Sequence, residues 1–501
     1  MDIWLKRMRR TGNGWSQKGI ILVMTLALMV AIVLSLGELV IKAVTDASGQ
    51  FIGLANFAKY FSTPALVTSL WNSIKISTAT TIIAVALGFA YAYAVERSGI
   101  KSKWLFRSMA LASADYRLYE AAETLGASKW RTFWTVTVPG TKFALISAMF
   151  VCFVLTFTDF GAPKVVGGQY NVLATDLYKQ VIGQQNMQMG AAVGVLLLLP
   201  AVLSFVMDRI SQRKQSGWLT AKSTPYRIER NKLRDALLYT LCSLVAVIIL
   251  GIVLVAVYGS LVKVWPYHLA ISFAHYEGFF DEAGPFTNSL LIALGTAAIG
   301  TAATFLFAYL IEKSRGFTAL RQGAYFLSML PLALPGLVLG LIYVFFFNNP
   351  SQPLHGLYGT IWIVILCNIV HFYSVSFLTM TSSLKKLDSE FEAASESMNV
   401  PWYRTLLRVT VPLSLPTILE IFVYYFINSM VTVSAIIFLY APDLKPAAVA
   451  IVNMEDSGDI APAAAMSTLI IVTNWLIRSA VMGVADSIRK KTDALLVRKD
   501  G

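Results

Sequence analysis

Charged residues are scarce in this 501-residue chain, where Asp, Glu, Lys and Arg together make up 14% of the sequence. A typical soluble protein has roughly 25%. Apolar residues reach 56%, and the mean hydropathy is +0.63. The composition excludes a water-soluble enzyme, which needs more polar surface, and a disordered chain, which is rich in charge and poor in apolar residues. We therefore expect a protein that crosses a membrane several times.

Other features are absent as well. The three cysteines, Cys152, Cys242 and Cys367, all fall inside apolar runs, so no disulfide framework is predicted. The sequence contains no G-x-x-x-x-G-K-[ST] phosphate loop, which excludes an ATPase of that kind. It also shows no nucleophile, acid pair or metal-ligand cluster. We therefore predict no catalytic residue, no bound metal and no cofactor.

Ten apolar runs are long enough to cross the hydrocarbon core as helices, which takes about 20 residues each. They lie near 20–44, 70–95, 143–162, 189–207, 236–262, 288–311, 323–348, 357–381, 414–439 and 462–484. Basic residues gather before the first run, between 208 and 235, and after the last run, whereas the loops on the opposite side are acidic or neutral. The positive-inside rule then predicts that both termini and the 208–235 stretch face the cytoplasm. The same rule accounts for the net charge of +13, so membrane lipid, not nucleic acid, is the expected surrounding.

The basic stretch 208–235 has the composition of a linker and divides the chain into a first half, 1–207, and a second half, 236–501. The halves are related. The sequence from Asn72 aligns with that from Asn288 at an offset of 216 residues, and the sequence from Trp130 aligns with that from Tyr403 at an offset of 273. Coinciding positions of the first pair are Asn72/Asn288, Ser73/Ser289, Tyr93/Tyr309 and Glu96/Glu312.

The first half is shorter than the second by one internal segment. Between the two alignments the offset grows by 57 residues, or by 56 if one residue is a local insertion in the second copy. In the second half this interval holds two spans, whereas the first half has an apparent junction near Ala110–Leu111. Losing two spans leaves the next loop on the same side, so the halves are predicted to be parallel repeats of four and six helices. We interpret the gap as a deletion from a symmetric parent.

Each half carries an unusual cytoplasmic loop, 119–140 in the first and 391–412 in the second, which we call the first and second coupling loops. Each begins with Glu-Ala-Ala, followed by helix formers, and ends with a proline. Glycine in the first copy, and asparagine in the second, is expected to end the short helix with a positive φ. The predicted site residues are Glu120, Ala121, Ala122, Gly126 and Pro139 in the first loop and Glu392, Ala393, Ala394, Asn399 and Pro412 in the second.

This pattern resembles the EAA loop of binding-protein-dependent ABC transporter permeases, and the resemblance covers nearly the whole chain apart from the gap. It implies an all-α polytopic membrane protein made of two parallel type I permease halves, with about ten helices. It also implies a bacterial inner-membrane importer driven by two cytoplasmic ABC ATPase subunits, one at each loop, and supplied by a periplasmic substrate-binding protein. Two fused halves are the arrangement of the iron(III)- and thiamine-type permeases. Residues 158–201 and 439–466 look most like 2-aminoethylphosphonate permeases, so the resemblance implies 2-aminoethylphosphonate as the substrate, with iron(III) or thiamine as the alternative.

Three polar residues within or near the spans are candidates for the transport pathway: Asp159, Asn368 and Asn428. Polar groups inside the bilayer are costly and are often functional. For Asp159 the alternative is an interfacial carboxylate that reaches water, and for Asn428 it is an interhelical hydrogen bond. A secondary transporter is the alternative function, but the intramembrane charges that such a protein needs are scarce. Because two pathway helices are missing, we expect this chain to insert in the membrane but to transport poorly.

Overall fold

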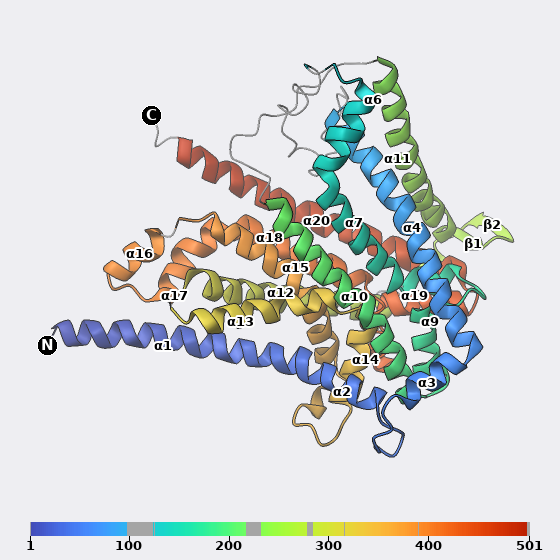
Figure 1. The fold of residues 1–501 in the computed structure, drawn as a ribbon, viewed down its shortest axis with the longest axis horizontal. Coiled ribbons are helices and arrows are strands. Elements are labelled where there is room, and N and C mark those ends of the chain that lie inside the picture. Colours follow the sequence, from blue (N-terminus) through green and yellow to red (C-terminus); the bar gives the residue numbers. More distant parts are fainter. Residues whose placement is uncertain are drawn as a thin grey trace. The chain divides into compact units, whose positions relative to one another are not determined.

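The structure is a computed structural model that describes residues 2–97, 124, 126–216, 232–277, 284–314, 316–388 and 390–497 (Figure 1). The chain groups into two compact units. Unit 1 comprises residues 1–57, 186–195 and 256–501, and unit 2 comprises residues 58–185 and 196–255. These two units do not coincide with the predicted halves, 1–207 and 236–501. The division into halves and linker therefore stays a prediction.

The described elements are almost all helical. In chain order they are α1 (Asp2–Leu28), η1 (Met29–Leu34), α2 (Ser35–Ala43), α3 (Ala55–Ser62), α4 (Pro64–Arg97), α6 (Lys129–Thr132), η3 (Phe133–Thr137), α7 (Val138–Phe157), α8 (Gly161–Val166), α9 (Leu173–Tyr178), η4 (Lys179–Gly183), α10 (Met187–Ser216), α11 (Lys232–Ser260), β1 (Val262–Val264), β2 (His268–Ile271), η5 (Ala274–Tyr276), α12 (Pro285–Lys313), α13 (Thr318–Met329), η6 (Leu330–Ala333), α14 (Gly336–Phe347), η7 (His355–Leu357), α15 (Ile361–Lys385), α16 (Glu390–Ser397), α17 (Trp402–Thr405), η8 (Leu406–Thr410), α18 (Val411–Val431), η9 (Pro442–Leu444), α19 (Ala447–Asp456) and α20 (Ile460–Val497). The strands β1 and β2 form one antiparallel hairpin, which the sequence analysis did not predict.

Within the described residues, nine helices are long and apolar enough to cross a membrane, and a bent pair can supply a tenth span. The predicted all-α polytopic fold is therefore confirmed. The predicted starts near 143 and 414 are too late, because the helical spans begin at Trp130 and Trp402. Both stretches mix aromatic and polar residues, a composition typical of the membrane interface, which hydropathy alone does not detect.

The predicted span near 323–348 is wrong as a single helix. The segments Thr318–Ala333 and Gly336–Phe347 meet at 111°. Pro335 has no N–H to donate to the preceding turn, and its ring disfavours helical backbone at the residue before it. Leu334 accordingly adopts an extended conformation, with φ −100° and ψ 117°.

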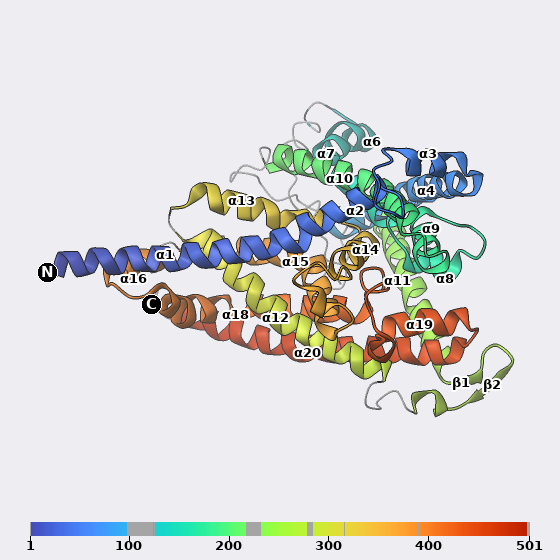
Figure 2. The ribbon, with the colours of Figure 1, turned by 90° about the horizontal axis from the view of Figure 1, so that it is seen from below.

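In unit 1, α12 packs on α15 and α18, and α20 packs on α18 (Figures 1 and 2). Gly300 of α12 permits this contact, since a Cβ there would lie 3.2 Å from the ring of Tyr425 and 3.3 Å from Ile369. The hydroxyls of Thr304 and Tyr425 are hydrogen-bonded at 2.9 Å. The helices α1 and α2 pack on α13 and α14, respectively. The chain's first span therefore packs with helices of the second half, which no sequence pattern predicted.

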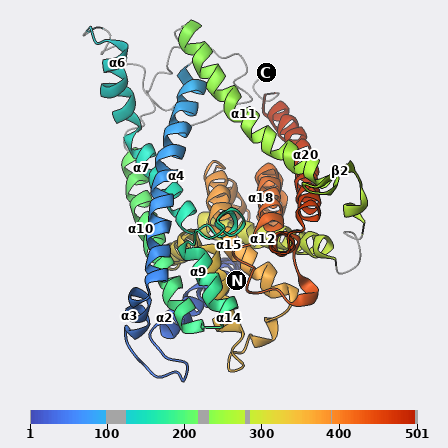
Figure 3. The same cartoon turned by 90° about the vertical axis from the view of Figure 1, so that its right-hand side faces the viewer.

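In unit 2, α4 packs along α7, and α9 packs on α4 (Figure 3). Thirty-one residues separate the end of α4 from the start of α6, whereas 88 separate the end of α12 from the start of α17. The second half uses the additional length for α13, α14 and α15. The spacing of the elements therefore agrees with the two-span gap inferred from the repeat.

Candidate coupling loops and transport pathway

The second coupling loop begins with α16, which carries Glu392, Ala393 and Ala394. Asn399 follows with a φ of +56°. The amide of Val400 donates to the carbonyl oxygen of Ser395 at 2.9 Å, which closes the end of the helix. Asparagine tolerates the left-handed region better than most residues. Asn399 thus has the positive φ expected of a residue in the glycine's place, and its role in the loop stays a prediction.

The first coupling loop has the same kind of backbone at Gly126, where φ is +70°. No atom lies within 4 Å of the position that a Cβ would occupy. The glycine is therefore favoured by its conformation and not by lack of space. The remaining predicted residues at the start of this loop, Glu120, Ala121 and Ala122, lie outside the described residues.

Both loops lead into the next membrane helix through a π-helical turn that the sequence analysis missed. The turns span Phe133–Thr137 and Leu406–Thr410, so they are 273 residues apart, like the aligned loops themselves. Pro139 and Pro412 then lie at the starts of α7 and α18, as predicted. The π turn is an uncommon element that is often found at functional sites. The repeat therefore extends to an irregular feature of the backbone.

The second coupling loop exposes several large apolar side chains. The exposed fractions are 45% for Phe391, 69% for Met398, 47% for Tyr403 and 62% for Leu407. Phe391 and Met398 lie outside the span that begins at Trp402, and exposed apolar groups in such a loop are typical of a surface that binds another protein. This pattern is consistent with a docking role for the loop.

The side chain of Glu392 points toward the membrane helices. Its Oε2 lies 3.6 Å from the Nζ of Lys313, the last residue of α12, and the two side chains are only 16% and 7% exposed. The same Nζ donates to the carbonyl oxygen of Leu387 at 2.8 Å. Sequence analysis missed Lys313. Its signal was available, because the repeat places another basic residue, Arg97, at the equivalent position.

At the other ends of α4 and α12, the repeated Asn-Ser pair makes the same contacts in both halves. The amide of Leu173 donates to the Oγ of Ser73, and the amide of Ala447 donates to the Oγ of Ser289, each at 2.7 Å. The bonded residues are 100 apart in the first half and 158 apart in the second. The structure thus confirms the equivalence of the two Asn-Ser pairs and again locates the length difference between them.

The asparagine side chains of these pairs complete the contact. The Nδ2 of Asn72 donates to the carbonyl oxygen of Asn171 at 3.0 Å. The Nδ2 of Asn288 donates to the carbonyl oxygens of Asp443, at 3.2 Å, and Lys445, at 3.5 Å. We call the two Asn-Ser pairs with these partners the first and second clamps.

The pathway candidate Asp159 lies beside the start of α8. Its Oδ1 accepts from the amide of Gly161 at 3.2 Å. Burial raises the pKa of this carboxyl above its usual value, while hydrogen bonds from the backbone of Gly161, Ala162 and Phe160 oppose the rise. The residue is partly buried and bonds to its own loop. A pathway role for it stays a prediction.

The two asparagine candidates have different partners. Asn368 of α15 is fully buried, and its Nδ2 donates to the Oγ of Ser429 in α18 at 2.7 Å. Among the described residues, its Oδ1 has no hydrogen-bond partner. The Nδ2 of Asn428 donates to the carbonyl oxygen of Tyr424 in its own helix at 2.7 Å, so the expected interhelical bond is made by Asn368 and not by Asn428. Pathway roles for both remain predictions.

Unit 2 also contains a buried carboxyl that was not among the predicted residues. Asp176 of α9 is 5% exposed. Burial raises its pKa to about 6, while a hydrogen bond with Ser69 and the charge of Lys179 act in the opposite direction. Counting from the two clamp amides, the equivalent residue in the second half is Ala450. This carboxyl is therefore a difference between the halves.

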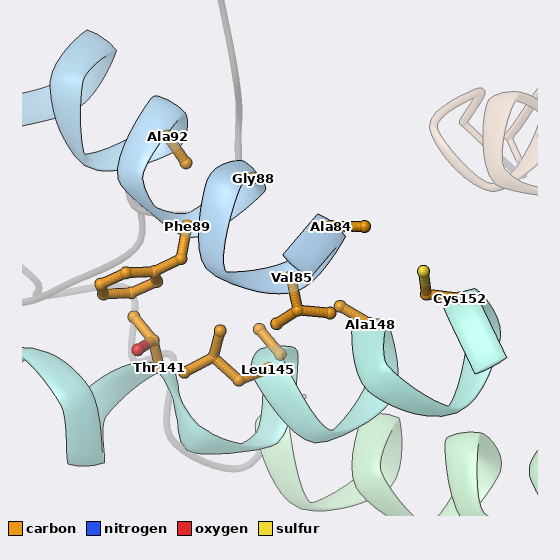
Figure 4. A pocket seen from close by; sticks show the side chains of 10 residues that line it. Ala84, Val85, Gly88, Phe89, Ala92, Thr141, Leu145, Ala148 and Cys152 are labelled. Atoms are coloured by element: carbon orange, nitrogen blue, oxygen red, sulfur yellow. The ribbon is translucent and has the colours of Figure 1, made fainter. Parts of the chain in front are cut away.

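An apolar cavity of about 290 Å³ opens between α4 and α7 (Figure 4). Its lining includes Gly88 and Phe89 from α4 and Leu145, Ala148 and Cys152 from α7. In the second half, the equivalent surface of α12 is covered by Tyr425 and by Ile369 of α15. The cavity thus lies where a counterpart of α15 would pack.

The described residues contain no group of three or more His, Cys, Asp or Glu side chains placed to hold a metal ion. They do contain two loops with repeated backbone geometry and two repeated clamps. These features define a duplicated membrane module with one such loop in each copy.

Comparison with known proteins identifies the class. The model of the family described as "binding-protein-dependent transport system inner membrane component" matches residues 6–217 and 300–486. The chain belongs to this family. It is thus a multi-pass inner-membrane protein and a transport component, in agreement with the prediction that it is not an enzyme.

The relatives include proteins named for two different substrates. A protein named as a ferric transport system permease in Haemophilus influenzae is 30% identical over 346 residues, which cover 67% of this chain and 54% of that protein. The ferric transport system permease of Actinobacillus pleuropneumoniae is 29% identical over 378 residues, covering 72% and 53%. A protein named as a 2-aminoethylphosphonate transport system permease in Salmonella typhimurium is 29% identical over 164 residues, covering 32% and 60%. The chain spans about half the length of the ferric relatives it matches.

Proposed function

We propose that the chain is the permease subunit of an ATP-driven importer, which receives a small solute from a periplasmic binding protein and releases it into the cytoplasm. ATP is hydrolysed by two separate ATPase subunits, one docked at each coupling loop. The observation that carries this proposal is the duplicated loop, in which a positive-φ residue, a π turn and a proline recur in the same order. The exposed apolar side chains of the second loop supply an ATPase-binding surface.

For the substrate we propose ferric iron in place of the 2-aminoethylphosphonate favoured by sequence analysis. The relatives named for ferric transport match about 70% of the chain, whereas the relative named for 2-aminoethylphosphonate transport matches 32%. Iron is the cargo here and not a resident cofactor. The phosphonate stays the second candidate because local similarity to that group exists.

The proposed orientation places both termini, the 208–235 linker and the coupling loops in the cytoplasm. It is supported by the basic residues of these segments, under the positive-inside rule. The clamps then lie toward the periplasm, because α4 and α12 each run from a clamp to a coupling loop. Single cysteines introduced at the linker and at the β1–β2 hairpin test this orientation by labelling from one side.

The function is tested by co-expressing the chain with the ATPase and binding protein of its own transport system. In lipid nanodiscs, ATP hydrolysis is measured with the binding protein either empty, loaded with ferric iron or loaded with 2-aminoethylphosphonate. We expect the ATPase to bind to this chain. We also expect the binding protein loaded with ferric iron to stimulate ATP hydrolysis, which is measured in this chain and in a version with the helix pair restored. Failure to bind any ATPase contradicts the permease assignment, and stimulation by the phosphonate alone contradicts the proposed substrate.

A further inference from the structure

Lys313 occupies a junction between the second coupling loop and the membrane helices. Its ammonium group lies against Glu392 of α16 and also bonds to the Leu387 carbonyl oxygen, just before α16. The ammonium group thus donates a hydrogen bond to the chain just before α16 and forms an ion pair with Glu392, at 3.6 Å, that is too long for a hydrogen bond. Because both charged side chains are largely buried, the pair is not one of the solvent-exposed ion pairs that contribute little.

Aromatic and backbone contacts reinforce this junction. Tyr309, one turn before Lys313, stacks on Trp402 at the start of α17, with the ring centroids 6.4 Å apart. Arg321 of α13 donates from its Nε to the carbonyl oxygen of Ile311 at 2.6 Å. The end of α12 is thus bound to the segments on both sides of α16 and is capped by a cation, which favours the helix dipole.

From this junction, α12 runs without interruption to the second clamp. It has 29 residues, with proline only at its start, and is therefore about 43 Å long. By contrast, α17 and α18 are joined by a π turn, and Pro416 lies inside α18. Kinks arise at such features. Among the helices that adjoin the loop, α12 is the one best suited to move as a rigid rod.

The far end of this rod holds the segment before α19. Asn288 and Ser289 are 4% and 2% exposed, and together they bind the backbone of residues 443, 445 and 447. A displacement of α12 along its axis would therefore move this segment with it. Rigid helices and packed contacts of this kind carry energetic coupling between distant sites.

The repeat supports the same reading in the first half. Arg97 and Glu120 are the sequence counterparts of Lys313 and Glu392. The helix α4 likewise runs from its clamp at Asn72 and Ser73 to Arg97. A basic residue at the end of the rod and an acidic residue in the loop therefore occur in both copies.

We propose that Lys313 is a positioning residue that ties Glu392 to α12, so that a push on the second coupling loop is carried by α12 to the second clamp. The proposal rests on the proposed function for the source of the push, which is the closing of an ATPase pair. The connection itself is a property of this chain alone. Lys313 touches no substrate and acts through Glu392 and the helix.

The connection is tested first without any partner. Hydrogen exchange of residues 390–397 is measured in the full chain in nanodiscs for the wild type, Lys313→Met and Lys313→Arg. The matched control is Lys386→Met, which removes an exposed lysine from the same side. We expect exchange in Lys313→Met to be at least about tenfold faster, because the remaining buried charge loses its partner, with retention in Lys313→Arg. Equal exchange in Lys313→Met and the control overturns the connection.

Transmission is tested with the ATPase bound and a non-hydrolysable ATP analogue added. In the wild type, the analogue should change hydrogen exchange at residues 443–447. In Lys313→Met the ATPase should still bind, but this change should be lost. The double variant Lys313→Glu with Glu392→Lys should restore it, which a merely structural role does not predict. A normal response in Lys313→Met overturns transmission. If no ATPase binds the wild type, both the proposed function and the transmission through α12 are contradicted. The hydrogen-exchange experiment without partners then still decides whether Lys313 connects Glu392 to α12.

Discussion

The two halves treat one repeated segment differently. Residues 161–166 form the helix α8 in the first half, where Val165 and Val166 are 41% and 82% exposed. Counting from the clamp amides, the equivalent residues are 435–440, which form a run of turns that is mostly buried. There the carbonyl oxygen of Ala435 accepts from the Sγ of Cys367 in α15 at 3.3 Å. A Cβ at Gly340 of α14 would lie only 2.6 Å from the same oxygen.

Because equivalent segments of the two halves adopt different backbones, neighbouring helices, and not local sequence alone, determine the conformation of this segment. In the second half α14 and α15 cover it and supply a polar partner, so non-helical backbone is stable inside the protein. In the first half, where the sequence predicts no counterpart of these helices, residues 161–166 form the helix α8. Backbone polar groups inside a membrane protein need hydrogen-bond partners. Both the helix in the first half and the buried turns in the second half supply them. We therefore expect the helix pair that the sequence predicts to be missing to affect more than the length of the first half.

The largest expected effect comes from restoring this pair. Inserting a copy of the second-half segment that holds α13, α14 and α15 at Ala110–Leu111 should fill the cavity between α4 and α7. We expect ferric iron uptake to rise from near background to a clear ATP-dependent signal, measured in proteoliposomes with the ATPase and binding protein. The 501-residue chain serves as the reference in this comparison. Normal uptake by that chain would contradict the prediction.

A smaller effect separates two glycines. Gly340→Ala places a methyl group against the backbone of Ala435 and should lower the free energy of unfolding by about 1–3 kcal/mol. Gly88→Ala, in the open cavity, meets nothing within 4 Å and should raise it by about 0.5–1 kcal/mol through helix propensity and unfolded-state entropy. Thermal unfolding in detergent measures both. Equal effects of the two variants would contradict the difference in packing between the two sites.

The buried carboxyl of Asp176 should make the first half sensitive to pH. The unfolded carboxyl ionises near pH 3.8 and the folded one near 6. Between these values the folded state binds more protons, so the free energy of unfolding should fall as the pH rises from about 4 to about 6. Asp176→Asn should remove this slope and stabilise the protein at pH 7 by about 1–3 kcal/mol. Thermal unfolding measured across pH 4–7 checks the slope, with Asp159→Asn as the comparison.

The smallest effect concerns the two loop residues with positive φ. Asn399→Gly should relieve the cost of the left-handed conformation and stabilise the protein by up to about 1 kcal/mol. Gly126→Ala should introduce that cost and destabilise by about 1 kcal/mol. Calorimetry of the two variants measures the difference. Effects of the same sign in both would mean that the loops do not share one backbone.

The sequence predicts much of this fold because its strongest signals are periodic or repeated. Apolar runs place the spans, and two alignments with different offsets locate the gap near Ala110–Leu111. The positive φ of Asn399 follows from its alignment with Gly126, since glycine at a helix end has one main physical reason. These predictions depend on local chemistry or on repetition, both of which can be read from one chain.

Other features depend on tertiary contacts and could not be predicted in the same way. The packing of α1 and α2 on α13 and α14 pairs segments nearly 300 residues apart. The junction of Lys313 with Glu392 requires α12 and α16 to meet. The 111° bend before Gly336 had a signal in the sequence. Pro331 and Pro335 indicate a break in the helix, but hydropathy alone does not detect it. The apolar run near 323–348 could therefore be predicted from the sequence, but the direction of its two segments was not.

If the chain carries two coupling loops of one kind, it should bind two ATPase subunits. Native mass spectrometry of the full chain, co-expressed with its ATPase and released from nanodiscs, counts the ATPase subunits bound to each chain. We predict two, despite the helices that the first half lacks. A count of one would show that the first loop does not dock, and a count of none would contradict the proposed function itself.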